Sequence, residues 1–210
     1  MFLEKFKHKL SLSEIIYYSG SYIKSNHVEL HAAAMRADRM SPFKMDTGLA
    51  IDESFRARVR ERVCQFVALS NCHCHVFSAE GLSYLRHDDE MDRLKSMMPE
   101  GSIEIVVYLR EPASFMASYR AEMKKHRLPD VIDRDSFAYV ADDSWLMDFD
   151  NRVARFRNAF GSEKVTVLDY DHEVRETGNV IPSFLRVLGV ESLFRPQDWS
   201  EFYLNRRPPA

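Results

Sequence analysis

Apolar residues along this chain recur mostly at helical spacing. The clearest stretch is 145–160, where aromatic and aliphatic side chains step by 4, 4, 3 and 4 from Trp145 to Phe160, and Gly161 follows as a terminator. Asn26 and Asp52 stand where helix-capping residues are expected. The spacing predicts helices over residues 2–10, 26–40, 52–71, 112–126, 145–160 and 179–188.

Nearly continuous apolar runs separate several of these helices and predict strands at 75–79, 103–109 and 165–170. The middle run is rich in β-branched residues, which is typical of a strand covered on both faces in a parallel sheet. Strands that alternate with helices indicate an α/β fold, here with a mostly parallel sheet flanked by helices in three layers.

Composition fits one globular domain that spans residues 1–210, because 45% of the residues are apolar and 29% are charged. No apolar run approaches the roughly 18 residues of a membrane helix, and the first residues lack the order of a signal peptide, which favours a cytoplasmic protein without a membrane partner. The formal net charge is −3 and the 29 basic residues are dispersed, so a nucleic-acid partner is not expected.

The cysteines and histidines of this chain do not predict a metal site. Three cysteines cannot pair completely, which fits a reducing compartment. The tract Cys72-His73-Cys74-His75 contains metal-binding residue types, but in a strand its cysteines and histidines face opposite sides, and no second ligand pair stands at zinc spacing. A strand that enters the core is the better interpretation.

Ligands of open α/β sheets bind at the carboxyl ends of the strands. That rule points to residues 78–80, to Arg110 and to residues 170–172. Arg110 directly follows the most apolar predicted strand, and the planar set of N–H donors on its guanidinium suits a phosphate group. Ser118, eight residues later, adds a hydroxyl group that can also bind phosphate. In the alternative interpretation Arg110 pairs with Glu111 or Glu122, and Ser118 is merely exposed.

These residues carry a resemblance to a known family. The segments Tyr108-Leu109-Arg110-Glu111-Pro112 and Ser118-Tyr119-Arg120 resemble the 3′-phosphate-binding segment of bacterial-type P-loop sulfotransferases, whose donor is 3′-phosphoadenosine 5′-phosphosulfate (PAPS). Weaker similarities follow in family order over nearly the whole chain, at Phe2-Leu3 with Leu10, Asn26-His27, Phe77-Ser78-Ala79-Glu80, Val165 to Tyr170 and Phe184 to Val190.

The resemblance implies a P-loop NTPase-like fold and a sulfotransferase that binds PAPS, or its product 3′-phosphoadenosine 5′-phosphate (PAP), without a metal. Arg110 and Ser118 would hold the 3′-phosphate, while His27 and Ser78 would line the acceptor pocket. Glu80 follows a strand at the carboxyl edge and is the candidate base for the acceptor hydroxyl or amine. In the alternative interpretation, Glu80 is a structural residue at the start of a helix, where its negative charge interacts favourably with the helix dipole. The alternative for His27 is a histidine without a functional role.

The sequence departs from the family in one respect, since the strand and Gly/Lys/Thr-rich loop for the 5′-phosphosulfate have no counterpart and would precede the first helix. We therefore expect a transferase that acts on a carbohydrate, lipid or small-molecule acceptor only in an upstream-extended form. The alternative is an inactive, N-terminally truncated sulfotransferase-like module that binds a nucleotide or a partner. A P-loop kinase-like phosphotransferase would need a phosphate loop and magnesium ligands, which are not identifiable.

Overall fold

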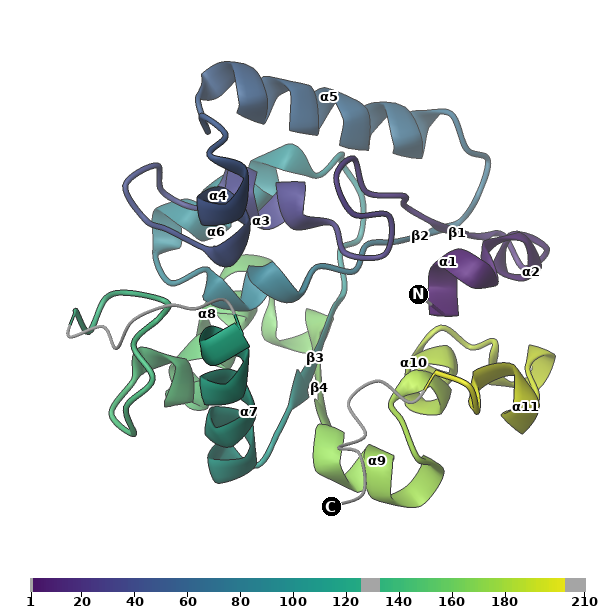
Figure 1. The fold of residues 1–210 in the computed structure, drawn as a ribbon. Coiled ribbons are helices and arrows are strands. Elements are labelled where there is room, and N and C mark those ends of the chain that lie inside the picture. The colour runs from purple at the N-terminus through teal and green to yellow at the C-terminus, as the bar shows by residue number, and fades with distance from the viewer. Residues whose placement is uncertain (1, 126–132, 203–210) are drawn as a thin grey trace.

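Two small parallel sheets form the centre of the protein in the computed structural model, which describes residues 2–125 and 133–202 (Figure 1). Strand β1 (Ile15–Tyr17) pairs with β2 (Cys74–Val76), and β3 (Ile105–Leu109) pairs with β4 (Val165–Asp169). The predicted α/β class with parallel strands is confirmed. The strands nevertheless form two sheets instead of one, since β2 and β3 do not pair with each other among the described residues.

Helices surround both sheets. They are α1 (Phe2–Lys5), α2 (Lys7–Ser11), α3 (Val28–Ala34), α4 (Pro42–Thr47), α5 (Glu53–Ala68), α6 (Asp88–Met97), α7 (Pro112–Lys125), α8 (Phe149–Phe160), α9 (Tyr170–Thr177), α10 (Ile181–Val187) and α11 (Pro196–Trp199), with short 3₁₀ turns η1 (Glu80–Tyr84), η2 (Trp145–Met147), η3 (Ser162–Lys164) and η4 (Glu191–Leu193). Within the described part of the chain, no helix is long and apolar enough to cross a membrane.

Local signals fix the helices that the pattern predicted best. The Asp52 carboxylate accepts the N–H of Phe55 at 2.7 Å and caps α5. Gly161 ends α8 with φ of +102°, and Gly189 follows α10 with φ of +71°, a backbone region that favours glycine. The end of the predicted helix 112–126 and the start of the following connection lie outside the described residues.

Several predicted elements are wrong in extent. The first helix is interrupted at Phe6, and the helix expected over 26–40 is only α3, because Met35 is extended with φ of −62° and ψ of 147°. His27 instead of Asn26 occupies the capping position of α3 and makes no side-chain capping bond. The pattern gave no assignment for β1 and did not predict α4, α6, α9 or α11.

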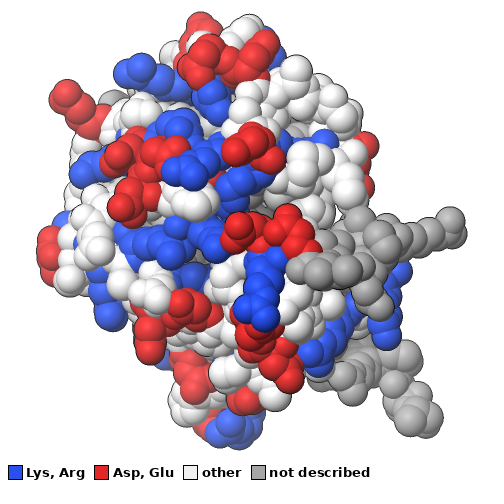
Figure 2. Space-filling model, turned by 90° about the vertical axis from the view of Figure 1, so that its left-hand side faces the viewer, with Lys and Arg blue, Asp and Glu red and all other residues white. Residues whose placement is uncertain are grey.

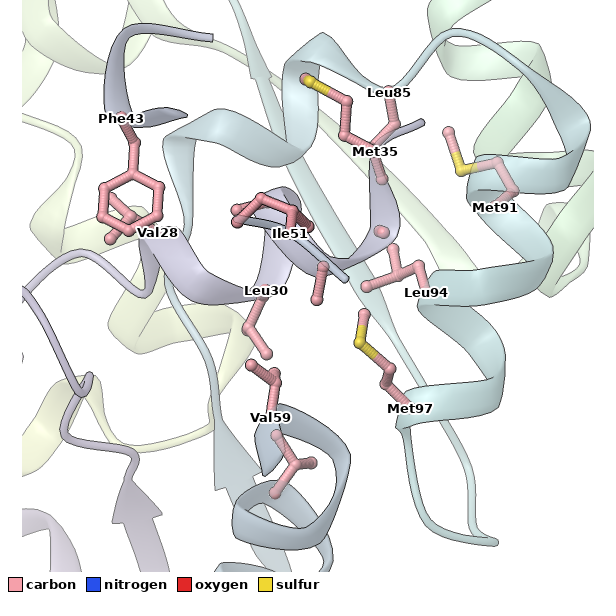
Figure 3. Close-up of a cluster of buried hydrophobic side chains, with 14 of the residues drawn as sticks. Val28, Leu30, Met35, Phe43, Ile51, Val59, Leu85, Met91, Leu94 and Met97 are labelled. Carbon is pink, nitrogen blue, oxygen red and sulfur yellow. The ribbon is translucent and has the colours of Figure 1, made fainter. Parts of the chain in front are cut away.

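The larger core lies around α3, of which every residue is buried. Helices α5, α6 and α8 and strand β3 enclose it, and Figure 3 shows the aliphatic, methionine and aromatic side chains that meet there. Leu30, Met35 and Val63 are fully inaccessible to solvent, and Leu85 and Leu94 nearly so. Burial of each such side chain stabilises the folded state by roughly 1.5 to 3 kcal/mol. This packing explains why a central helix of only seven residues is stable.

A second core joins the two ends of the described chain. Phe2 of α1 packs against Phe194 and Phe202 with ring centroids 5.4 and 5.3 Å apart. Leu10, Leu185 and the side chains of β1 complete this core. Helices α1 and α2 therefore lie beside α10 and α11, as Figure 1 shows.

Charge on the face drawn in Figure 2 is mixed, with acidic and basic side chains interspersed. The ion pairs include a network in which Arg36 and Arg93 both contact Asp89, while Arg39 contacts the buried Glu90. The acidic partners neutralise the charge of these basic side chains, whose main role is therefore structural.

Candidate functional site

A cavity of about 2360 Å³ lies between the two sheets and is lined by residues of β2, η1, β3, α7 and α10. Its wall includes four of the five predicted site residues, Ser78, Glu80, Arg110 and Ser118. The fifth, His27, is fully buried and is not part of that wall. The carboxyl ends of β2 and β3 thus open into one space, as expected for a ligand site of an α/β protein.

Arg110 is positioned by the parallel register of β3 and β4, which aligns Leu109 with Asp169. Its guanidinium lies 5.3 Å from the centre of the Tyr170 ring, and its Nε is 3.7 Å from the Asp171 carboxylate. The Nε atom is buried and has no hydrogen-bond partner in the described structure. A forked donor is therefore held at the strand end with its hydrogen-bonding capacity largely unused.

One of the two carboxylates that the alternative interpretation places beside Arg110 is already engaged elsewhere. Glu111 accepts the N–H groups of Ala113 and Ser114 at 3.0 and 2.7 Å. These two backbone bonds, more than the charge of Arg110, lower the pKa of Glu111. Glu111 therefore serves the start of α7, and within the described residues Arg110 forms its ion pair with Asp171, which belongs to the predicted strand-end segment 170–172.

Ser118 lies on the exposed side of α7, two turns beyond Arg110, and forms part of the cavity wall. Its hydroxyl has no hydrogen bond within the described residues, so it is available to a ligand in the cavity. The predicted pair of Arg110 and Ser118 therefore faces one space.

Glu80 begins η1, and residues 77–79 separate it from the end of β2 at Val76. Its side chain is accessible to solvent at the cavity wall. Many protein atoms nevertheless surround the carboxyl group beyond its direct contacts. Burial, followed by the negative charge of Glu122, raises the pKa of Glu80. A carboxylate with a raised pKa is a better proton acceptor than an ordinary surface glutamate, as a general base requires.

His27 and Ser78 hold the end of β2 to the start of α3. The His27 N–H donates to the Ser78 carbonyl, and the Ser78 N–H donates to His27 Nδ1, both at 2.9 Å. Because Nδ1 accepts a hydrogen bond, the neutral ring carries its proton on Nε2. Burial, the largest influence, lowers the pKa of His27. The ring therefore has a structural role, and contact of either residue with an acceptor stays a prediction.

Sequence reasoning missed a second group on the cavity wall, formed by Tyr84, Tyr119 and Arg152. The Tyr119 hydroxyl lies 3.3 Å from that of Tyr84 and donates to the Phe137 carbonyl at 2.8 Å. Burial raises the pKa of Tyr84 to about 12 and that of Tyr119 further still, so both stay neutral at physiological pH. The sequence gave no specific signal for Arg152, because the same amphipathic helix also carries Arg155 and Arg157.

Around the cysteine and histidine tract, as elsewhere among the described residues, no cluster of three or more potential metal ligands is found. His73 contacts Glu14 through Nδ1 at 3.2 Å, and His75 hydrogen-bonds Ser70 through Nε2. The two rings therefore serve different neighbours on either side of Cys74.

No family model and no curated protein sequence matches this chain. Among solved structures, one described as a sulfotransferase from Alicyclobacillus acidocaldarius superposes with a TM-score of 0.57 and 15% sequence identity. The match covers 96% of this chain and 85% of the other. Identity this low establishes the architecture alone, and on that basis the chain has a sulfotransferase-like fold.

Proposed function

We propose that this protein binds a 3′-phosphorylated adenine nucleotide in the cavity between its sheets and transfers the sulfuryl group of PAPS to an acceptor. The observation that carries the proposal is Arg110, which lines the cavity at the end of β3 and whose Nε, although 3.7 Å from the Asp171 carboxylate, makes no hydrogen bond within the described residues. Ser118 on the same wall supplies a hydroxyl for the same phosphate. The fold shared with a solved sulfotransferase supports this assignment.

In the proposed reaction, the acceptor hydroxyl or amine attacks the sulfur in line, the new bond to sulfur forms and the bond to the 5′-phosphate oxygen breaks. Glu80 takes the acceptor proton, and PAP leaves with the electron pair of the broken bond. The sulfuryl group and the 5′-phosphate need hydrogen-bond donors of their own. By the family resemblance those donors belong to the phosphate loop, which this sequence does not contain.

A second candidate function is nucleotide binding without turnover. The observation that favours it is the division of the sheet. Among the described residues, β2 and β3 both border the cavity but do not pair with each other. The two functions share the PAP site and differ only in sulfuryl transfer, so binding and turnover are measured separately.

Calorimetric titration with PAP and with adenosine 5′-monophosphate tests the donor site, since the two nucleotides differ by the 3′-phosphate. We expect PAP to bind more tightly, and Arg110→Ala to weaken PAP binding by about 1.5 to 3 kcal/mol while leaving the monophosphate unaffected. Lys124→Ala, which removes an exposed basic residue from α7, the helix that follows Arg110, serves as the control because Lys124 does not line the cavity. Equal affinity for the two nucleotides would refute the proposed site.

Turnover with radiolabelled PAPS tests the role of Glu80. If the protein transfers sulfate, Glu80→Gln is expected to lower turnover at least about 100-fold while PAP affinity changes little, as for a lost general base. Unchanged turnover would assign Glu80 to the start of η1 alone. PAP binding without any turnover in the unaltered protein would support the second function.

A further inference from the structure

Arg152 carries a positive charge that no side chain of the described structure neutralises. It lies in the first part of α8 and reaches the cavity wall, where the side chain is only partly accessible to solvent. Within the described part of the chain, its one hydrogen bond runs from Nη1 to the Leu146 carbonyl at 2.7 Å. Among residues 2–125 and 133–202 it forms no ion pair with a carboxylate, whereas buried charges in proteins are normally paired.

The surroundings of Arg152 are mainly aromatic. Its guanidinium lies 5.9 Å from the ring centre of Phe115 and 5.5 Å from that of Phe149. The Phe115 ring stacks on Tyr119 with centroids 5.7 Å apart. Cation–π contacts offset part of the cost of removing the guanidinium from water, but they leave its charge intact.

The titratable groups that face Arg152 do not balance its charge either. They are the hydroxyls of Tyr84 and Tyr119, which stay protonated, and the like charge of Arg155. Burial is the main reason that the pKa of Arg152 falls to about 10, which is still high enough to keep the side chain charged at neutral pH. The charge of Glu80 raises the pKa of both tyrosines but is not among the groups that shift the pKa of Arg152.

We propose that Arg152 binds an anionic group, a carboxylate or a sulfate ester, on a ligand whose apolar body lies against Tyr84, Phe115 and Tyr119. A planar guanidinium pairs with both groups through two parallel hydrogen bonds, and such pairing in a poorly hydrated pocket relieves the unbalanced charge. The site is distinct from Arg110, which follows β3 and pairs with Asp171. If the proposed function holds, the ligand at Arg152 is the acceptor, and this sulfotransferase prefers negatively charged acceptors.

Benzoate and its neutral isostere benzamide are suitable probes, followed by ligand-observed NMR titration. We expect benzoate to bind the unaltered protein at least about tenfold more tightly than benzamide, a difference of about 1.4 kcal/mol. Arg152→Gln should reduce benzoate affinity to the benzamide level, and Arg152→Lys should retain part of it. Arg157→Gln, which removes an exposed arginine from the same helix, should change nothing.

Equal binding of the two probes, or benzoate binding that survives Arg152→Gln, would overturn the proposal. A parallel titration of Arg110→Gln separates the two sites, because loss of benzoate binding in that variant alone would place the anion at Arg110. Arg152→Lys keeps the charge and gives a readout even if Arg152→Gln fails to fold. The probes contain no nucleotide, so failure of PAP binding would refute the proposed function and leave this result standing.

Discussion

At the scale of single residues, His31 shows how burial determines the charge state of a side chain. The ring is 3% exposed, its Nε2 lies 3.2 Å from the Ser41 hydroxyl, and its Nδ1 has no hydrogen-bond partner in the described structure. Gly81 packs so closely that a Cβ atom there would stand 2.1 Å from Nδ1. Burial, followed by the positive charge of Lys44, lowers the pKa of His31 to about 4.

The pKa of His31 predicts how stability depends on pH. As pH falls from about 6.5 to 4, the unfolded chain takes up a proton at His31 that the folded protein does not, so the free energy of unfolding decreases. We expect urea denaturation to show that the unaltered protein loses about 1 to 2 kcal/mol more than His31→Gln between pH 7 and 5. His8→Gln, at an exposed position, is the control and should follow the unaltered protein. Parallel curves for the unaltered protein and His31→Gln would contradict the buried, neutral ring.

At the scale of elements, Glu90 explains why the chain turns away after α3. Its fully buried carboxylate accepts the N–H groups of Arg36, Arg86 and His87 and both oxygens contact the Arg39 guanidinium. Burial alone raises the pKa of Glu90, but these bonds outweigh it, so the pKa lies below its usual value. One side chain of α6 thereby holds the segment after α3 and the segment before α6.

Loss of this carboxylate is expected to be costly. Glu90→Ala leaves three N–H groups and the Arg39 cation without their partner, and we expect it to lower the free energy of unfolding by about 3 to 5 kcal/mol. Asp92→Ala, at an exposed position of the same helix, should change stability by less than about 0.5 kcal/mol. Chemical denaturation of both variants measures the difference, and similar effects would show that the network contributes little.

At the scale of the whole molecule, each sheet belongs to a different core. Strands β3 and β4 pack with the core around α3, whereas β1 and β2 pack with the core that joins α1, α2 and α10. The cavity lies between the two sheets. Because apolar contacts are dense within each core, the two are expected to open as separate units in hydrogen exchange.

Leu185→Ala and Leu94→Ala form a matched pair for this prediction, since both leucines are almost completely buried but in different cores. Each truncation should cost about 2 to 5 kcal/mol in its own core. Hydrogen exchange followed by mass spectrometry should show faster exchange of α2 and α10 in Leu185→Ala, and of α3 and α6 in Leu94→Ala. Acceleration of all four helices by either variant would indicate a single cooperative unit.

Elements whose signals are local could be predicted from the amino-acid pattern. Helices α5, α7 and α8 and strands β3 and β4 follow from periodicity, β-branching and capping residues within one segment, and the structure confirms them with small changes in their bounds. The same local reasoning placed Arg110 at a strand end, because an apolar run that stops at a charged residue identifies the end of a buried strand. Parallel strands then required that this end share an edge with residues 170–172.

Tertiary structure decided whatever depends on residues far apart in the chain. The predicted helix 26–40 stops at Ala34 because Glu90 holds the following turn, and Asp171 pairs with Arg110 because β3 and β4 lie in register. The division of the sheet and the unbalanced charge of Arg152 likewise depend on which distant segments come together. Periodicity shows which face of an element is apolar. Which segment covers that face, and whether it brings a partner for a charged side chain there, is decided only when the whole chain has folded.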